Sequence, residues 1–323
     1  MSYKSRVPKQ LESFMKVITD SSYRDNHYTL SKKLGLRASG LPFCPLKFIL
    51  SLPKLFAGEE TATGSAFFFR VGTTVHEVVQ KGVEIAVKEL EQDAGMIPIA
   101  DWKCLHCGHL HTFIPRPDEC EFCKHHQFEM LEHTVRYRQL TGHIDNVFLM
   151  QPQNKYLIVD YKTATVKKVE GKEEAVFGNV QQIGTYVAIK HSDGYKMLGW
   201  ALIYIARNSL WSWYPVLEED PDNEGFLRRL NKFCDLHEEL LTAESLGDKE
   251  WGLALDNRVC KTKKQVEERG GYCAFKDICS AHCNGDSAPL EMQRKHVVRF
   301  ISNKLPLAQW LELDDKVGYA KIK

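Results

Sequence analysis

Residues 142–162 read GHIDNVFLMQPQNKYLIVDYK, and this stretch decides the fold of the chain. Two apolar, strand-like runs flank the polar turn QPQN, which is the pattern of a β-hairpin. Side chains along a strand repeat every second residue, so Asp160 and Lys162 share one face. Pairing of the two runs brings Asp145 close to that face. Two carboxylates and an ammonium at a sheet edge predict a divalent-metal site suited to phosphodiester hydrolysis.

The composition is that of a soluble globular protein, with 323 residues of which 43% are hydrophobic and 26% charged. The formal net charge is +1, so bulk charge carries no nucleic-acid signature and any DNA-binding surface must be local. No run of about 18 apolar residues predicts a membrane span. The N-terminus, MSYKSRVPKQLESF, lacks the apolar core of a secretory signal. We therefore expect a cytoplasmic protein, in a bacterium or a phage-infected host.

Four of the ten cysteines form the pattern C-x2-C-x12-C-x2-C, at Cys104, Cys107, Cys120 and Cys123. In a reducing compartment such thiols bind metal rather than form disulfides. Two cysteine pairs joined by a short hairpin supply the tetrahedral thiolate site that Zn²⁺ prefers, which predicts a zinc ribbon over residues 101–128. We favour a structural role for it, with a DNA or partner contact as the alternative. The cysteine set is complete without the neighbouring histidines, which are competing ligands: His106, His109, His111, His125 and His126.

A helix is predicted from the apolar periodicity of residues 75–87, after a loop at residues 57–66. Thr73 or Thr74 is its expected N-cap, which places His76 in the first turn. Taken alone, a histidine there indicates only a local hydrogen bond.

Three strand-like runs predict a meander: TVRYR at residues 134–138, a neighbouring run that carries Asp145, and YLIVDYKT at residues 156–163. Alternation along the first run places its basic residues on one face. The candidate contacts to DNA phosphates lie in this strand and in the loop after the third one: Arg136, Arg138, Lys167 and Lys168.

Further along the chain, residues 173–190 are predicted to be helical, with Gln182 and Tyr186 four residues apart and hence on one face. The apolar run WALIYIA, residues 200–206, predicts a strand in the centre of the sheet. An amphipathic helix over residues 223–247 carries Cys234 toward the core.

Four cysteines, Cys260, Cys273, Cys279 and Cys283, gather in a late segment that is poor in apolar residues. Such a segment cannot pack on itself, so metal binding is the reason we expect for its cysteines. Cys44 is the remaining distant thiol of the right type.

The order of these motifs resembles that of the RecB-like nucleases of the PD-(D/E)xK superfamily. The motifs are His76, then GHID with Asp145, then VDYKT with Asp160 and Lys162, then Gln182-x3-Tyr186. One cysteine upstream and a cysteine cluster downstream are similar to the iron–sulfur subgroup. That subgroup includes CRISPR-associated iron–sulfur exonucleases and AddB-type nuclease domains. The resemblance extends from about Cys44 to Cys283.

The resemblance implies an α/β fold with a restriction-endonuclease-like core, in which helices flank a mixed central sheet. Residues 1–323 would form one RecB-like nuclease domain. The ribbon at 101–128 would be an insertion, similar to accessories of phage and mobile-element enzymes. A C-terminal iron–sulfur segment, 258–285, would pair with Cys44.

The resemblance also implies a structural 4Fe–4S cluster. Its expected ligands are Cys44, Cys260, Cys273 and Cys279. The subgroup pattern C-x2-C-x5-C survives here only as Cys273 and Cys279, so Cys283 is a rival of Cys260. Zinc bound by the same thiols is the alternative to iron and sulfur.

For the catalytic site the resemblance implies Mg²⁺ or Mn²⁺ held by oxygen ligands. The implied ligands are Asp145, Asp160, the imidazole of His76 and the backbone carbonyl of Tyr161. Lys162 would orient the attacking water and stabilise charge on the phosphate. Gln182 and Tyr186 would hold the DNA strand near the site.

The function that follows is a metal-dependent DNA exonuclease acting on single strands or DNA ends, in replication, recombination or repair. One alternative is a structure-specific endonuclease of the same fold. Another is a non-catalytic module that recruits a helicase or recombinase. The sequence contains no GxxxxGK[ST] motif, so unwinding must come from another chain. Expected partners are DNA, a helicase, a recombinase or a single-strand-binding protein.

Overall fold

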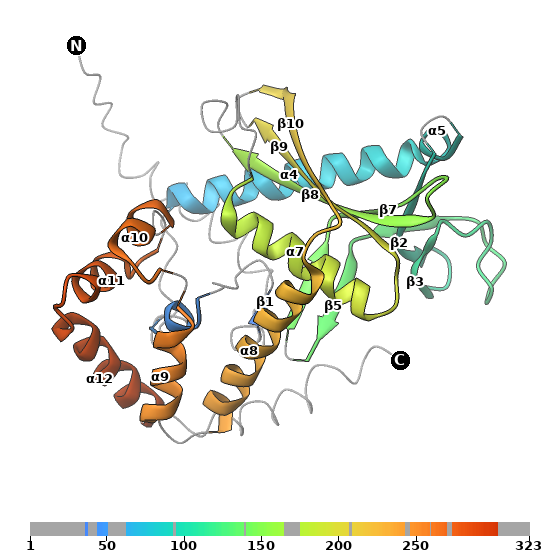
Figure 1. Ribbon diagram of the computed structural model, residues 1–323. Coiled ribbons are helices and arrows are strands. Elements are labelled where there is room, and N and C mark those ends of the chain that lie inside the picture. The colour runs from blue at the N-terminus through green and yellow to red at the C-terminus, as the bar shows by residue number, and fades with distance from the viewer. Residues whose placement is uncertain are drawn as a thin grey trace, which may run out of the picture.

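The protein is described by a computed structural model (Figure 1). The structure describes residues 36–37, 44–50, 63–92, 95–138, 140–164, 175–206, 209–242, 246–258, 260–269 and 273–302. Lys167 and Lys168, predicted to contact phosphates, lie outside these ranges. No helix within them is both long and apolar enough to cross a membrane.

Two sheets organise the chain. The larger is seven-stranded, in the order β10-β9-β8-β7-β2-β3 with β4 also paired to β2, and the smaller has the order β1-β6-β5. In the larger sheet β8 runs parallel to β9, while the other neighbours pair antiparallel. The strands are β1 (Leu36–Arg37), β2 (Met96–Cys104), β3 (Leu110–Pro115), β4 (Phe128–Leu131), β5 (His133–Tyr137), β6 (Leu140–Ile144), β7 (Asn146–Met150), β8 (Lys155–Ala164), β9 (Met197–Ala206) and β10 (Ser209–Glu219).

Helices cover both faces of the larger sheet, as Figure 1 shows. A further helical stretch occupies residues 45–50. The helices are α4 (Thr63–Ile85), α5 (Val87–Gln92), α7 (Phe177–Ser192), α8 (Asn223–Thr242), α9 (Asp248–Asp256), α10 (Lys263–Arg269), α11 (Lys276–Cys283) and α12 (Ala288–Ser302). The predicted fold class, a mixed sheet flanked by helices, is therefore confirmed.

Strand β8 shows how alternation builds the two halves of the core. Leu157 and Val159 pack against Val75 of α4. Ile158, between them in sequence, packs on the opposite face with Ile183 of α7. Successive side chains of a strand point to opposite faces, so a strand that is apolar throughout must be covered on both sides.

A separate apolar cluster joins the two ends of the described chain. Leu46, Ile49 and Leu50 pack with residues of the C-terminal helices, among them Trp251 and Leu290. Cys44, Cys273 and Cys279 lie at the border of this cluster. The N-terminal helical stretch is thus held against the C-terminal helices by burial of apolar surface.

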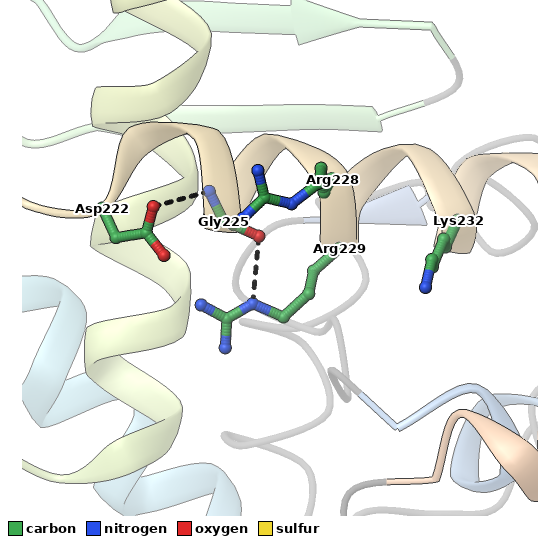
Figure 2. Close-up of a pocket in the computed structure, with 5 residues that line it drawn as sticks. All are labelled: Asp222, Gly225, Arg228, Arg229 and Lys232. Carbon is green, nitrogen blue, oxygen red and sulfur yellow. Dashed lines mark hydrogen bonds between the residues drawn. The ribbon is translucent and has the colours of Figure 1, made fainter.

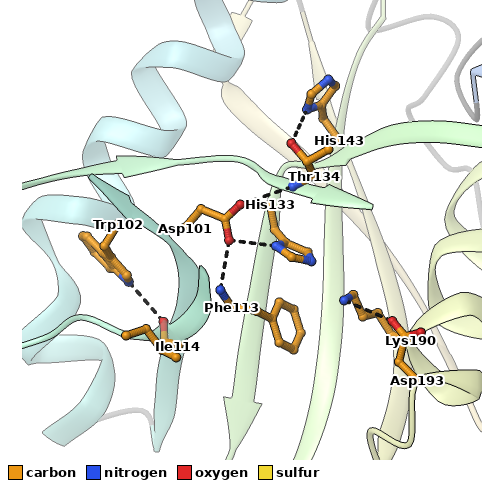
Figure 3. Close-up of polar contacts among 9 residues, drawn as sticks. All are labelled: Asp101, Trp102, Phe113, Ile114, His133, Thr134, His143, Lys190 and Asp193. Carbon is orange, nitrogen blue, oxygen red and sulfur yellow. Dashed lines mark hydrogen bonds and ion pairs between the residues drawn. The ribbon is translucent and has the colours of Figure 1, made fainter. Parts of the chain in front are cut away.

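The cysteine ribbon is continuous with the large sheet, because both contain strand β2. Strand β2 pairs with β7 through Met96–Ile99 and with β3 and β4 further along. At the junction the buried Asp101 accepts a hydrogen bond from the Phe113 amide at 2.9 Å and contacts His133 Nδ1 at 2.8 Å (Figure 3). The Lys190 ammonium of α7 lies 4.3 Å from the centre of the Phe113 ring. The ribbon is therefore attached to the core by a shared strand and by polar contacts.

The predicted start of the helix that carries His76 is wrong. Helix α4 begins at Thr63, so His76 lies in the middle of a long helix and not in a first turn capped by Thr73 or Thr74. The end of the predicted 57–66 loop is already helical. The start was misplaced because a favourable N-cap residue inside a helix resembles a true start.

The predicted meander is also wrong. The GHI strand, β6, pairs with β5 in the small sheet, whereas β7 and β8 form the hairpin in the large sheet. By contrast, the run WALIYIA is an interior strand, with β8 and β10 as its neighbours, and Cys234 is fully buried, both as predicted.

Candidate functional site

The candidate site lies where β6 and β7 part. Ile144 is the last residue of β6 and Asn146 the first of β7, so Asp145 stands alone between two sheets. Its Oδ2 accepts the backbone N–H of Tyr161 in β8 at 2.8 Å. That hydrogen bond ties the carboxylate to the central strand and leaves its second oxygen for another partner.

Helix α4 brings His76 to this carboxylate. Val75 and Val79 pack on the sheet, which orients the helix so that His76 Nδ1 lies 3.4 Å from Asp145 Oδ2. Burial lowers the pKa of His76, but the hydrogen bond and charge of Asp145, together with Asp160, outweigh it and raise the pKa. The raised pKa reflects a strongly negative site, which is an environment that also attracts cations.

Asp160 and Lys162 meet on one face of β8, as their spacing predicts. Lys162 Nζ lies 2.7 Å from Asp160 Oδ2, and Asp160 is only 2% exposed. Burial raises the pKa of Asp160, the ammonium of Lys162 opposes this, and the charge of Asp145 adds to it. A buried carboxylate with one ammonium partner beside further acids is poised to share a cation.

Glu132 completes the site and was missed by the sequence analysis. Ligand atoms of His76, Glu132 and Asp145 all lie within 4.8 Å of one another. Burial first, and then the charge of Asp145, raise the pKa of Glu132 to about 7. The pairing register of β5 with β6 is the feature that identifies Glu132 as a site residue. His133 pairs with Ile144, which sets Glu132 opposite Asp145 just beyond the ladder.

The site therefore differs in detail from the predicted ligand set. His76 and Asp145 come together as predicted, and Asp160 lies close enough for its charge to act on His76 and Glu132. Tyr161 donates its backbone N–H to Asp145, a contact other than the predicted one through its carbonyl. The donor set, one imidazole and carboxylate oxygens, fits a hard divalent cation such as Mg²⁺ or Mn²⁺.

Gln182 and Tyr186 lie beneath the site rather than on its surface. Their exposed fractions are 8% and 1%, and Gln182 Nε2 donates to the Tyr186 hydroxyl at 3.4 Å. The Tyr186 ring lies against Gly142, where a Cβ atom would be 2.5 Å from Cε1. In this geometry the pair packs beneath strand β6, whose last residue, Ile144, directly precedes Asp145.

Arg138 and Arg136, two of the residues predicted to contact DNA phosphates, lie in different environments. Arg138 forms ion pairs with Asp235 and Glu238 of α8, both at 2.7 Å. It therefore joins the β5–β6 turn to α8. Arg136 is exposed on β5, on the strand face that also carries Thr134.

A basic hollow is found elsewhere, at the start of α8 (Figure 2). Asp222 caps the helix by accepting the Gly225 amide at 2.9 Å, and Arg228 lies 3.4 Å from Glu224. None of the residues that line this hollow is a ligand of the candidate site, so we do not assign the chemistry to it.

The four ribbon cysteines converge as their spacing predicts. Cys104 Sγ lies 3.5 Å from Cys123 Sγ, and Cys107 Sγ lies 3.6 Å from Cys120 Sγ. Four thiolates around one zinc ion at about 2.3 Å are separated by about 3.8 Å, so the geometry fits zinc. Hydrogen bonds from the Cys107 and His106 amides lower the pKa of Cys104, whereas burial and the neighbouring thiols raise the pKa of Cys123, so the convergence of the four sulfur atoms is what supports zinc.

The second cysteine group also gathers. Burial, together with the charges of Cys44, Cys273 and Cys260, raises the pKa of Cys279 to about 12. Cys283 instead donates its thiol to the Lys261 carbonyl at 3.6 Å. Cys283 lies four residues after Cys279 on α11, so Cys260 and Cys283 both remain candidates for the fourth member.

Two comparisons with known proteins bear on the site. The family model described as the PD-(D/E)XK nuclease superfamily matches residues 37–280, most of the chain. The matched range contains every residue of the candidate site and of the ribbon. No curated protein matches the chain.

Proposed function

Because the chain belongs to the PD-(D/E)XK nuclease superfamily, we propose that it is a metal-dependent deoxyribonuclease that degrades single-stranded DNA or DNA ends as an exonuclease. Members of this superfamily are generally nucleases that use divalent metal ions. The observation that carries the proposal is the meeting of His76, Glu132 and Asp145 beside the Asp160–Lys162 pair.

The roles follow from the contacts. His76, Glu132 and Asp145 would hold the ion, with Asp160 supplying a further carboxylate. Mg²⁺ or Mn²⁺ bound there would supply an activated water and neutralise charge on the phosphate. Lys162 would place its ammonium against the reacting phosphate oxygens, held in position by Asp160 at 2.7 Å. The Tyr161 amide fixes Asp145, so that this ligand does not need to reorganise.

A polar track on the small sheet supports a strand of DNA as the substrate. Thr134 pairs with His143 and Arg136 with Thr141, so these side chains continue the face that begins with Glu132 and Asp145. His143 and Arg136 are exposed, and Thr134 Oγ1 lies 3.4 Å from His143 Nδ1. Hydroxyl, imidazole and guanidinium groups are suitable donors to phosphate oxygens. A single strand lying along this track would reach the metal ligands directly.

The cysteine groups have separate proposed cofactors. Among the described residues, the cysteine group whose sulfur atoms all lie within 4.8 Å of one another is that of the ribbon. For the group around Cys279 we favour the 4Fe–4S cluster that the resemblance to the iron–sulfur subgroup implies. Cys44, Cys260, Cys273 and Cys279 would hold this cluster and tie the N-terminal helical stretch to the C-terminal segment.

The test is a nuclease assay with end-labelled linear and circular single-stranded DNA, with and without Mg²⁺ or Mn²⁺. We expect metal-dependent loss of linear substrate only. Asp160→Ala and Glu132→Gln should each lower the rate at least roughly 100-fold. Asp256→Ala, an exposed carboxylate on α9, is the matched control and should leave the rate unchanged.

The outcomes separate the possibilities. Cleavage of the circular substrate would replace the exonuclease by an endonuclease of the same fold. A wild-type protein that hydrolyses neither substrate, or an Asp160→Ala variant with full activity, would overturn the site.

A further inference from the structure

Two histidines and a glutamate form a second group of possible ligands on the ribbon, apart from the four cysteines. His109 directly precedes β3, His111 is the second residue of that strand, and Glu121 lies between Cys120 and Cys123. One ligand atom of each lies within 4.8 Å of the others. His109 Nε2 is 3.3 Å and His111 Nδ1 is 3.9 Å from the same oxygen, Glu121 Oε1.

Packing holds both imidazoles in place. The His109 ring lies 3.8 Å from the ring of Phe122 and meets His111 edge-on at 4.7 Å. The His111 ring also lies 5.6 Å from that of Phe128, and its side chain is only 8% exposed. Two rings whose orientation is fixed by neighbours point their nitrogens at one place, which is the preorganisation that a metal site needs.

His111 also carries a polar atom that the protein leaves without a partner. Its Nε2 is buried and has no hydrogen-bond partner in the part of the chain that the structure describes. An ordinary ion pair between His109 and Glu121 would not require a second, buried imidazole on the same oxygen. The ring nitrogen that faces Glu121 is Nδ1, at 3.9 Å from Oε1, so a metal ion would bind at Nδ1 and leave the proton on the buried Nε2.

The distances suit a transition-metal ion. Nitrogen and oxygen ligands at about 2.0–2.2 Å around a tetrahedral ion lie about 3.3 Å apart. The pair His109–Glu121 already has this separation at 3.3 Å, and the pair His111–Glu121 would close by about half an ångström. Glu121, whose side chain is 68% exposed, is free to make that adjustment.

We propose that His109, His111 and Glu121 form a second divalent-metal site on the ribbon, of the zinc class, with three protein ligands and an open position. Two imidazoles and one carboxylate are the ligand types that zinc takes in sites that retain an exchangeable ligand. The site cross-links β3 to the second cysteine pair. The neighbouring side chains of Glu121 and Phe122 are exposed, so solvent reaches the site from their side. It is independent of the proposed nuclease activity.

The test measures zinc in the full-length chain after dialysis against a series of buffered free zinc concentrations. Glu121→Gln removes the exposed carboxylate and leaves both imidazole rings in place. Glu119→Gln is the matched control, because Glu119 is an exposed ribbon carboxylate that pairs with Lys124 at 2.8 Å. Glu121→Gln and His109→Ala should each lose about one zinc ion per chain relative to wild type and to Glu119→Gln. The catalytic residues are intact in all four proteins, so any zinc bound there cancels.

Cobalt substitution identifies which ion is lost. The thiolate-to-cobalt charge-transfer band reports the cysteine site and should be unchanged in Glu121→Gln, while the weaker bands of the nitrogen and oxygen site disappear. Equal zinc content in Glu121→Gln, His109→Ala and wild type would overturn the proposal. Loss of the charge-transfer band in Glu121→Gln would also overturn it, because Glu121 would then serve the cysteine site.

Discussion

Gly142→Ala tests whether Tyr186 positions strand β6 and, through it, Asp145, the residue that follows this strand. A Cβ at residue 142 would lie 2.5 Å from Tyr186 Cε1 and 2.7 Å from its hydroxyl oxygen. Ordinary contacts begin at about 3.4 Å, so the strand and the ring must separate by about 0.9 Å. Tyr186 is 1% exposed and cannot swing away, so strand β6 is the element that moves.

Overpacking of this kind lowers the free energy of unfolding by about 1–3 kcal/mol. Asp145 follows Gly142 by three residues, and a displacement of about 1 Å at a catalytic group lowers the rate roughly 100-fold. Urea unfolding measures the first quantity, and single-turnover cleavage at saturating Mg²⁺ measures the second. Gly178→Ala is the control, because a Cβ there meets nothing within 4 Å.

A double-mutant cycle with Tyr186→Ala separates the clash from other effects. If the clash is the cause, the stability cost of Gly142→Ala should shrink by about 1–2 kcal/mol once the ring is removed. Wild-type stability and rate in Gly142→Ala, or an unchanged cost without the Tyr186 ring, would refute the reasoning.

Three further predictions follow from the contacts. Burial raises the pKa of Asp101, but His133 and two backbone amides outweigh this effect, and the net result is a lowered pKa. The ionised Asp101 therefore stabilises the folded protein above about pH 4. This contribution to the free energy of unfolding is lost as the pH falls through the lowered pKa. Asp101→Asn should cost about 1–3 kcal/mol at neutral pH and flatten this acid dependence in urea unfolding. Cys279→Ser should abolish the visible iron–sulfur absorption while Cys283→Ser retains it; identical spectra would reject the ligand set. Arg138→Ala should lower the free energy of unfolding by about 0.5–1 kcal/mol without weakening DNA binding. A large loss of DNA affinity in this variant would instead support the predicted contact between Arg138 and a DNA phosphate.

Local patterns explain why much of the site could be predicted. The same-face placement of Asp160 and Lys162 needs only the period of a strand, and the convergence of Cys104 with its three partners needs only the two short spacings. Both depend on residues close in sequence, where covalent geometry restricts the possible arrangements.

Long-range register explains what could not be predicted. Glu132 becomes a site residue because β5 pairs with β6 in one register, and a shift of one residue would turn its side chain to the other face. The separation of β6 from β7 at Asp145 also depends on which strands find partners in each sheet. Gln182 and Tyr186 share a helix face, as predicted, but only the packing of α7 shows that this face is buried.

The sequence by itself therefore determined the identity and order of the chemical groups: a histidine, two acidic residues with a lysine, and two sets of cysteines. Tertiary structure alone decided that Glu132 joins His76 and Asp145, that Cys44 is brought to the apolar cluster that Cys273 and Cys279 border, and that Tyr186 packs against Gly142 beneath the site. The physical reason is that residue type and short-range periodicity are local properties. Which distant groups become neighbours depends on the packing of apolar faces over the whole chain.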